Sequence, residues 1–265
     1  MAGEILYERH GPVRLITIDR ADQMNSLDFA ANDHLTEIWR EFAADDEARA
    51  AVITGAGEKA FCAGADLKTY TIDYATRPAA EFRERYTDGT GFGGITRGLD
   101  IGRPIVAAIN GYAIFGGLEL AEACDIRFCS PNAEFAHQDI NWGFHPCDGG
   151  CVSLPQIVGL GNAMEMILSS ERIDAAHAHR IGLVNRIYPL AELVTESLEF
   201  ADVLASRAPL EQRYAKEVML RTLDMPVADA LKLESRSFYD LGQTEDIKEG
   251  TTAFREKRPV NFKGR

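Results

Sequence analysis

The chain has 265 residues, of which 46% are hydrophobic, and a formal net charge of -13 at pH 7. This size and apolar content can bury a large core, either as one domain or as a domain with a smaller appendage. Its apolar runs are far shorter than a bilayer span, and its start lacks a signal or transit pattern, so we expect a soluble cytoplasmic protein without a membrane partner. The negative charge repels phosphate backbones, which argues against nucleic-acid binding.

The N-terminal part of the chain predicts a hairpin, a helix and a strand. Alternating apolar and polar residues at 4–9 and 13–19, on either side of a Gly-Pro turn, are typical of a β-hairpin. Residues 28–44 have helical periodicity, and a buried strand is expected at 51–54. The glycine-rich run at 88–94 resembles a dinucleotide-binding fingerprint, but no apolar strand precedes it, so we predict a flexible loop.

The second half indicates further strands and then only helices. An apolar strand at 104–109 leads to a glycine pair and a helix that begins at Gly116, and short strands are expected at 125–130 and 184–188. Strands that are each followed by a helix indicate an α/β layer arrangement. From Ala208 onward helical stripes continue without a strand, and such a block commonly packs on a neighbour, here another subunit.

The cysteines and histidines do not form a metal-binding pattern. Five cysteines in a chain without a secretion signal favour reduced thiols, and Cys147 and Cys151 have neither zinc-knuckle spacing nor a second pair. No His-Glu-x-x-His motif occurs. We therefore predict no metal site, and solvated or hydrogen-bonded side chains for His137, His145, His177 and His179.

The glycine pair has a chemical interpretation. If Gly116 begins a helix, its N–H is an unpaired donor at the positive end of the helix dipole, which is half of an oxyanion hole. The loop 61–67 is the best source of a second donor, because its small residues permit close backbone approach after a strand. Tight packing of a loop explains the same residues equally well.

Two carboxylates accompany these donors. Glu119 lies in the first helical turn, where the dipole favours its ionised form; it suits a general base, and it equally suits a stabilising first-turn acid. Asp139 follows a strand in an irregular segment, where it is either a turn or cap residue or a second catalytic carboxylate. Two carboxylates and two N–H donors around one pocket would serve chemistry through an enolate.

Six segments together identify a family resemblance. They are 61–67, 105–113, 116–121, 124–126, 172–184 and 249–258. In order and spacing they closely resemble the enoyl-CoA hydratase/isomerase, or crotonase, family, along nearly the whole chain. The resemblance implies an α/β spiral core of repeated ββα units over 1–205, which holds the CoA and catalytic site, and a C-terminal helical trimerisation region over 206–265. It implies a homotrimer or a dimer of trimers, and coenzyme A as part of an acyl-CoA substrate and not as a permanently bound cofactor.

The resemblance also implies roles for individual residues. Ala65 and Gly116 look like the oxyanion-hole pair that binds the thioester carbonyl. Glu119 and Asp139 occupy the catalytic carboxylate positions of the hydratases, where one activates water for attack at the β-carbon and the other exchanges a proton at the α-carbon. The residues expected to border the adenine and pantetheine of CoA are Ala63, Asp66, Leu67 and Lys68.

Three positions depart from the family pattern. Asp139 stands where hydratases typically have glutamate, so the carboxylate reaches one methylene less far. Phe115 replaces the first residue of a glycine triplet and puts an aromatic ring close to the expected acyl channel. Asp148 adds a third acid where the typical pocket is apolar, either as a catalytic group or as the N-cap of a helix that begins near Gly149.

The leading functional hypothesis is hydration of a 2-enoyl-CoA by Glu119 and Asp139. Double-bond isomerisation, which needs one carboxylate, is the nearest alternative. Hydrolytic C–C cleavage would use Asp148 with His137 or His145. An aroyl-CoA dehalogenase would need a histidine base from 70–100, where the sequence has none. A non-catalytic or RNA-associated relative fits poorly with the acidic charge and the two carboxylates.

Overall fold

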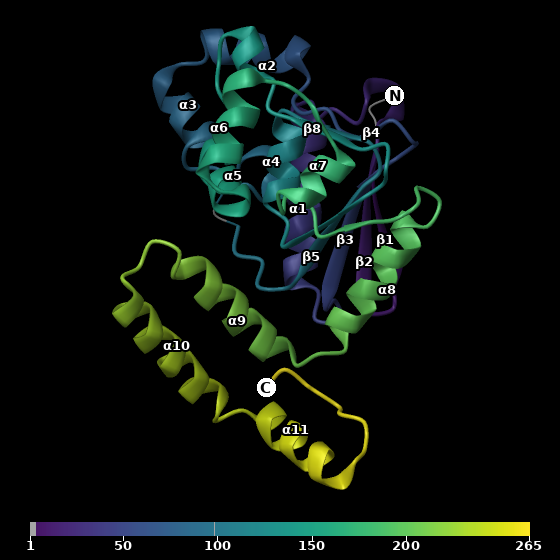
Figure 1. The fold of residues 1–265 in the computed structure, drawn as a ribbon, viewed down its shortest axis with the longest axis vertical. Helices are drawn as coiled ribbons and strands as arrows, with labels where there is room; N and C mark the ends of the chain where they lie inside the picture. Colours follow the sequence, from purple (N-terminus) through teal and green to yellow (C-terminus); the bar gives the residue numbers. More distant parts are fainter. Residues whose placement is uncertain (1–3, 98) are drawn as a thin grey trace.

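The computed structural model describes residues 4–97 and 99–265, and the strands of these residues form two sheets (Figure 1). The larger sheet has the order β1-β2-β3-β5-β7-β10 and the smaller one β4-β6-β8-β9. The strands of the larger sheet are β1 (Glu4–His10), β2 (Val13–Asp19), β3 (Ala50–Gly55), β5 (Ile105–Ile109), β7 (Ile126–Cys129) and β10 (Arg186–Ile187). Those of the smaller sheet are β4 (Ala60–Cys62), β6 (Tyr112–Ile114), β8 (Glu134–Ala136) and β9 (Ile173–Asp174).

The chain begins with the predicted hairpin. Strands β1 and β2 pair antiparallel from Glu4 opposite Asp19 to His10 opposite Val13. Gly11, in the two-residue turn, has a φ of +56°, a conformation that glycine adopts readily. The hairpin prediction is therefore confirmed.

The remaining core strands wind as a repeating spiral. In each of the pairs β3/β4, β5/β6 and β7/β8, the first strand joins the larger sheet and the second joins the smaller sheet. Successive turns pair in parallel: β3 with β5 and β5 with β7 in one sheet, β4 with β6 and β6 with β8 in the other. This repeat confirms the expected α/β spiral.

Helices cover both sides of the larger sheet. Helix α1 starts behind Asp28, whose carboxylate accepts a hydrogen bond from the N–H of Ala31 at 2.9 Å, and it buries Trp39 in the main core. Helix α8 packs on β2, β3 and β5 from the other face and buries Leu193. The helices of this body are α1 (Phe29–Ala44), α2 (Leu67–Thr76), α3 (Ala79–Tyr86), α4 (Gly116–Glu122), α5 (Gly150–Val158), α6 (Leu160–Ser169), α7 (Ala175–Arg180) and α8 (Leu193–Ala205), with 3-10 turns η1 (Ala21–Gln23), η2 (Phe92–Gly94) and η3 (Asp139–Trp142).

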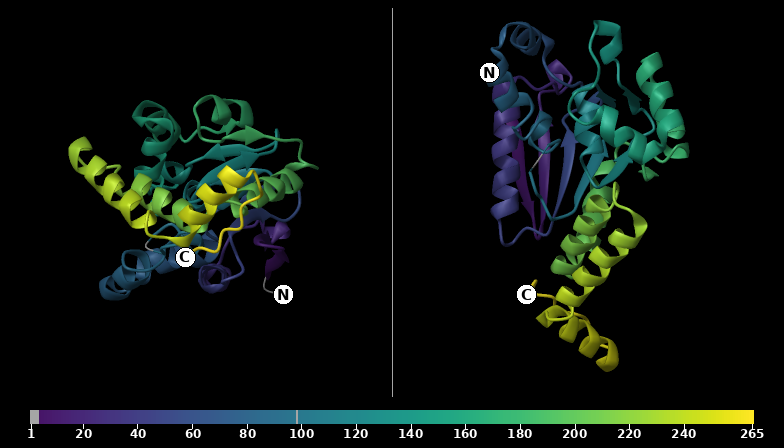
Figure 2. Two further views of the ribbon diagram at one scale, coloured as in Figure 1. Left: turned by 90° about the horizontal axis from the view of Figure 1, so that it is seen from below. Right: turned by 90° about the vertical axis from the view of Figure 1, so that its left-hand side faces the viewer.

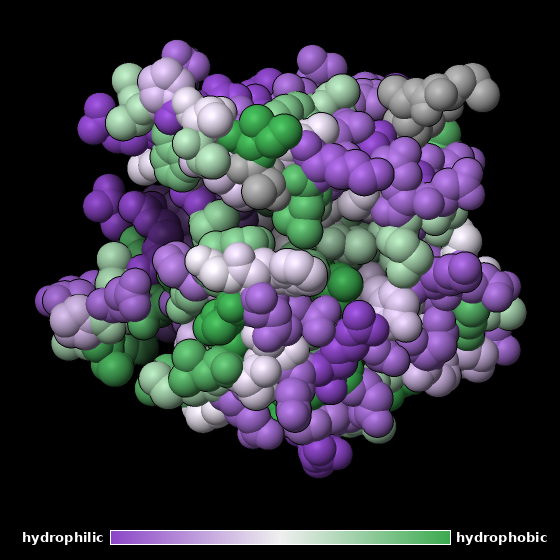
Figure 3. Space-filling view, turned by 90° about the horizontal axis from the view of Figure 1, so that it is seen from above, coloured by the Kyte–Doolittle hydropathy of each residue, from purple (hydrophilic) through white to green (hydrophobic). Residues whose placement is uncertain are grey.

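The last three helices, α9 (Pro209–Arg221), α10 (Val227–Leu241) and α11 (Glu245–Glu256), extend from the body as an arm (Figures 1 and 2). No residue of α9 or α10 is buried within this chain. Phe238 on α10 is 70% exposed and Phe254 on α11 is 86% exposed. The opposite end of the molecule, seen from above in Figure 3, has apolar side chains interspersed among hydrophilic ones. Among the described residues, no helix combines the length and apolarity needed to cross a bilayer.

Candidate active site

The glycine pair opens helix α4, as the sequence predicted. Strand β6 ends at Ile114, Phe115 is the N-cap, and Gly116 is the first helical residue. Phe115 adopts φ +53° and ψ −133°, a conformation that glycine enters readily and that strains a residue with a Cβ. The N–H of Gly116 has no acceptor among the residues that the structure describes. It is therefore available as a hydrogen-bond donor.

The loop 63–66 lies against this helix start. A Cβ built on Gly64, whose φ is +87°, would lie 3.0 Å from the nitrogen of Gly116 and 2.8 Å from Cβ of Phe115. The loop is held from its other side by a short parallel bridge, in which Leu27 N–H donates to Gly64 O and Asp66 N–H donates to Leu27 O. Within the described chain, the N–H of Ala65, between these two bonds, has no acceptor. The predicted donor pair thus comes from two segments in direct contact.

The carboxylate of Glu119 is hydrogen-bonded to two backbone N–H groups. Its Oε1 accepts hydrogen bonds from the N–H groups of Asp148 at 2.7 Å and Gly150 at 3.0 Å, and the side chain is buried. Burial first, and then the negative charge of Asp148, raise the pKa of Glu119 to about 7, although the two N–H donors oppose the rise. A carboxyl group that titrates near neutral pH is suited to give or take a proton.

Asp139 is the first residue of η3 and is also buried. Its Oδ2 has no hydrogen-bond partner among the described residues and lies 3.8 Å from Nδ1 of His137. Gly150 lies between Glu119 and His137. The N–H of Gly150 donates to Glu119, and a Cβ built on Gly150 would lie 2.6 Å from Cε1 of His137. The structure therefore brings both predicted carboxylates around His137 and Gly150.

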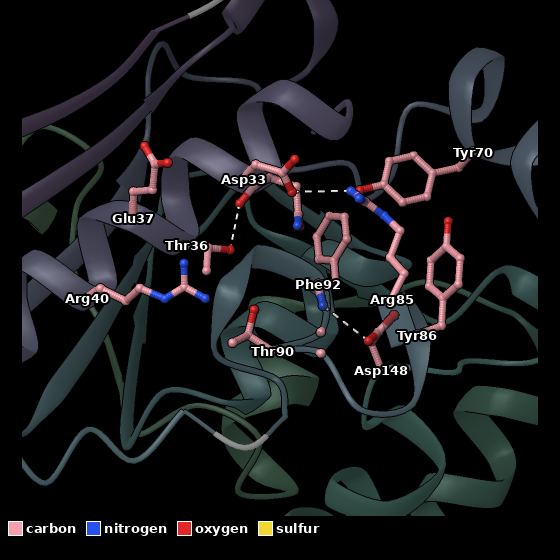
Figure 4. Close-up of a pocket in the computed structure, with 13 residues that line it drawn as sticks. Asp33, Thr36, Glu37, Arg40, Tyr70, Arg85, Tyr86, Thr90, Phe92 and Asp148 are labelled. Carbon is pink, nitrogen blue, oxygen red and sulfur yellow. Dashed lines mark hydrogen bonds and ion pairs between the residues drawn. The ribbon is translucent and has the colours of Figure 1, made fainter. Parts of the chain in front are cut away.

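Asp148 has a different structural role from the N-cap considered for it. The N-cap of α5 is Gly149, and no side chain caps that helix. The carboxylate of Asp148 instead turns toward the 92–97 segment, where its Oδ1 accepts from Phe92 N–H at 3.1 Å (Figure 4). The same oxygen accepts from Arg97 Nε at 3.2 Å. The N-cap interpretation is wrong because these donors, more than 50 residues away in sequence, occupy the carboxylate.

The glycine-rich run 88–94 is also more ordered than predicted. Phe92, Gly93 and Gly94 are buried in η2, and positive φ angles at Gly91, Gly93 and Gly94 permit the tight path. Trp39 Nε1–H donates to Gly93 O at 2.9 Å, which fixes the turn against α1. A Cβ on Gly116 would lie 3.0 Å from the Phe92 ring. The turn 92–94 is therefore a packed wall of the site, and the loop prediction is wrong for this part of the run, whereas 88–91 has no regular structure.

A cavity of about 390 Å³ adjoins this wall, between α1, the α2–α3 region and the 89–92 turn (Figure 4). Phe92 and Asp148 line it, together with polar side chains that include Tyr70, Arg85 and Thr90. Glu119 and Asp139 are not among its lining residues. The cavity therefore adjoins the site through Phe92 and Asp148, and neither predicted carboxylate lines it.

The residues expected to border CoA follow β4 directly. Asp66 caps α2, because its carboxylate accepts from the N–H of Lys68 at 3.0 Å. Leu67 and Lys68 are exposed, and Ala63 N–H donates to Met24 O at 3.0 Å. These side chains thus lie at the surface edge of the loop that contains Ala65.

Glu122 was missed by the sequence reasoning. It follows Glu119 by three residues, so both lie on one helix face, and its Oε1 lies 2.9 Å from Nε2 of the fully buried His137. His137, considered earlier as a partner of Asp148, is bonded to Glu122 instead. The sequence signal that could have identified this pair is the second glutamate in the otherwise apolar helix α4. Within the described residues, no group of three or more His, Cys, Asp or Glu side chains is arranged to hold a metal ion.

The spiral of paired strands, together with two unpartnered N–H donors at the start of the Glu119 helix and in the adjoining loop, is typical of the crotonase class of α/β proteins. The sequence matches the family model described as enoyl-CoA hydratase/isomerase over residues 8–265. The chain belongs to this family.

Individual relatives cover the chain almost completely. It is 35% identical to the short-chain-enoyl-CoA hydratase of Clostridium acetobutylicum, with 98% of both chains covered. It is 37% identical to the carnitinyl-CoA dehydratase of Citrobacter koseri, with 100% of both covered. The crystal structure of an enoyl-CoA hydratase from Bacillus anthracis matches with a TM-score of 0.89 at 33% identity, covering 98% of this chain and 99% of that one.

Proposed function

We propose that the protein is an enoyl-CoA hydratase, which adds water across the 2,3 double bond of an acyl-CoA thioester. The observation that carries the proposal is a pair of buried carboxylates, Glu119 and Asp139, in a chain whose Glu119 helix begins with the unpartnered N–H of Gly116, close to the unpartnered N–H of Ala65. Hydration needs both kinds of group, because negative charge gathers on the thioester oxygen while protons move at water and at the α-carbon. The names of two relatives, a hydratase and a dehydratase, describe this reaction and its reverse.

In this proposal the N–H groups of Ala65 and Gly116 hold the thioester oxygen as it becomes an enolate. Two fixed donors stabilise that charge without reorganising during the reaction. Glu119 and Asp139 exchange protons with water and the α-carbon. Coenzyme A enters as part of the substrate along the segment 63–68 that contains Ala65.

The alternative activities receive less support from the geometry. An isomerase needs one carboxylate, whereas Glu119 and Asp139 are both buried here. A C–C hydrolase would need Asp148 as a reacting group, but its carboxylate is engaged by Phe92 N–H and Arg97, and His137 faces Glu122 instead. Water addition accounts for both buried carboxylates.

We also infer that the protein works as a homo-oligomer, a trimer or a dimer of trimers, through the arm formed by α9, α10 and α11. The arm carries large apolar side chains, including Phe238 and Phe254, that the chain itself leaves uncovered. Helices with an uncovered apolar face usually pack on another copy of the chain or on a partner protein.

The experiment that tests the hydratase is the conversion of crotonyl-CoA in ¹⁸O-labelled water, with the loss of enoyl absorbance followed and the product analysed by mass spectrometry. Glu119→Gln is the variant expected to be impaired, and its side chain keeps an oxygen that can accept from the two N–H donors. Its turnover should fall by about 10²–10⁴-fold, the usual contribution of general acid–base catalysis. Glu171→Gln, on an exposed loop, is the matched control and should keep wild-type turnover. Equal rates for Glu119→Gln and wild type would remove Glu119 from the mechanism.

A further inference from the structure

The loop 146–150 supplies both of the backbone groups that bind Glu119. The N–H groups of Asp148 and Gly150 donate to the same oxygen, Glu119 Oε1, at 2.7 and 3.0 Å. Gly149, between them, has a φ of +126°, a conformation that glycine adopts at little cost. Within the described chain, no hydrogen bond reaches the other oxygen, Glu119 Oε2. The loop therefore holds one oxygen of Glu119 and leaves the second for proton exchange.

The side chain of Asp148 ties this loop to a segment that is distant in sequence. Its Oδ1 accepts from the N–H of Phe92 at 3.1 Å and from Arg97 Nε at 3.2 Å. Both donors lie more than 50 residues before Asp148, and the carboxylate is only 8% exposed. One residue thus binds Glu119 through its backbone and the segment 92–97 through its side chain.

Arg97 adds two further contacts to this link. Its guanidinium also donates to the carbonyl oxygens of Tyr86, at the end of α3, and of Cys147, next to Asp148. The turn η2, at the start of the same segment, is fixed to α1 by two hydrogen bonds of 2.7 and 2.9 Å that involve side chains of α1. The donors that hold the Asp148 carboxylate therefore belong to a packed part of the body.

Folding stability is a poor explanation for a carboxylate at position 148. Burial and the negative charge of Asp148 both raise the pKa of Glu119, so the two acidic groups oppose each other's charge. An ion pair that is largely removed from water, such as that of Asp148 with Arg97, is also weak evidence for a gain in stability. What the carboxylate does provide is a fixed position for the backbone N–H that binds Glu119.

We propose that Asp148 is a positioning residue: its carboxylate, bound to the segment 92–97, holds the loop 146–150 so that the N–H groups of the loop orient Glu119. No bond to the Asp148 side chain forms or breaks in the reaction, and no proton passes through it. A displacement of about 1 Å in a positioning group can cost about 10²-fold in rate, so the link bears directly on turnover. The inference rests on the proposed hydratase, in which Glu119 exchanges a proton.

The kinetic test compares kcat for hydration of crotonyl-CoA in Asp148→Ala and Asp148→Asn. Both variants remove the negative charge, but the asparagine oxygen can still accept from Phe92 N–H, so their difference isolates the hydrogen-bonded link. We expect kcat to fall about 10²-fold in Asp148→Ala and to stay within about tenfold of wild type in Asp148→Asn. Asp202→Ala, exposed on α8, is the matched control and should keep the wild-type kcat. Equal values of kcat in the alanine and asparagine variants would contradict the proposal.

A double variant separates positioning of Glu119 from an independent role of Asp148. In the Glu119→Gln background the loop has no carboxylate to orient, so adding Asp148→Ala should lower the residual kcat by less than about threefold. A further loss of about 10²-fold in this background would show that Asp148 acts as a reacting group or through the fold, and would overturn the proposal.

Hydrogen–deuterium exchange of the full chain, read by mass spectrometry, tests the link without turnover. Peptides that cover the loop 146–150 should exchange faster in Asp148→Ala than in wild type, because the loop can then open without breaking bonds to the segment 92–97. Peptides from α8 should exchange alike in both proteins. Unchanged exchange of the loop in Asp148→Ala would contradict the proposal. If the proposed function alone is wrong, wild type yields no hydration of crotonyl-CoA while the exchange still shows that Asp148 holds the loop.

Discussion

Glu119 lies in an environment that opposes its own charge. The side chain is buried, and the negative Asp148 is close, so its carboxylate is destabilised despite the two N–H groups that it accepts from. Such a group lowers the stability of the folded protein once it ionises. Because active sites often contain groups of this kind, we attribute its retention to catalysis and not to folding.

The stability of the folded protein should depend on pH through Glu119. The pKa of Glu119 is about 7 in the folded chain against an ordinary 4.5, so the folded state binds the extra proton between these values and loses stability as pH rises through that window. The free energy of unfolding that is lost across this pH window is at most about 3 kcal/mol. Glu119→Gln removes it, so the variant should be more stable than wild type at pH 8 and nearly equal at pH 5.

Urea unfolding at the two pH values measures this difference, and comparison of the two proteins cancels the other titrating groups. A stability difference that stays the same at pH 5 and pH 8 would show that Glu119 has an ordinary pKa in the folded state.

Residue spacing predicted part of the site and missed the rest for a physical reason. The helix start at Gly116 and the position of Glu119 in its first turn depend on local patterns, and the structure places both as expected. The partners of Asp148 and His137 are set by tertiary contacts: Phe92 is 56 residues from Asp148, and Glu122 is 15 from His137. Local sequence reasoning has no access to such pairs.

At the scale of elements, the start of α4 depends on two glycines for different reasons. Gly116 lies against the Phe92 ring, a side chain that can shift. Gly117 lies against backbone: a Cβ there would be 1.9 Å from the carbonyl oxygen of Cys62. The second glycine is therefore what allows α4 to approach β4 closely enough to bring the loop 63–66 beside Gly116.

We predict that Gly117→Ala destabilises the protein by several kcal/mol or prevents folding, because a strand carbonyl must move to admit the methyl group. Gly161→Ala is the matched control: it lies in helix α6 with nothing within 4 Å of its Cβ position, and it should stabilise the protein by about 0.5–1 kcal/mol. Thermal or urea unfolding of both variants measures this, and equal stabilities would contradict the close packing of α4 on β4.

Element prediction succeeded where periodicity was long and failed where elements were short. The hairpin and α1 have clear repeats over 7 to 16 residues, and both were predicted. Strands β8 and β9 have three and two residues and were not predicted, because pairing with β6 and with each other, rather than pattern, makes them strands. The absence of a preceding apolar strand predicted a loop where η2 lies, whereas the positive φ angles of Gly93 and Gly94 serve a buried turn.

At the scale of the whole molecule, the spiral body and the helical arm differ in how they are stabilised. The body buries two apolar clusters around its sheets, whereas α9 and α10 bury no residue. An ion pair between Lys216 and Asp125, at 2.8 Å, joins the arm to the body. Both side chains of this pair are partly buried, but a single ion pair leaves the apolar side chains of the arm uncovered, and these are the basis of the proposed assembly.

We therefore predict that Phe238→Asp lowers the molar mass in solution toward that of one chain, because it places a charge on an apolar side chain of the arm that the proposed contact would bury. Leu168→Asp is the matched control: it adds the same charge to an equally exposed leucine on α6, outside the arm. Size-exclusion chromatography with light scattering measures the mass. A wild-type protein that is monomeric at micromolar concentration would refute the proposed assembly.

The central claim is that this site adds water to an enoyl-CoA, and the origin of the new oxygen atom tests it most directly. With crotonyl-CoA in ¹⁸O-labelled water, the wild-type protein should give 3-hydroxybutyryl-CoA with one labelled oxygen on carbon 3, and Glu119→Gln should give almost none. Deuterium exchange at the α-carbon without oxygen uptake, or no conversion of straight-chain, branched or aromatic enoyl-CoA esters, would contradict the claim.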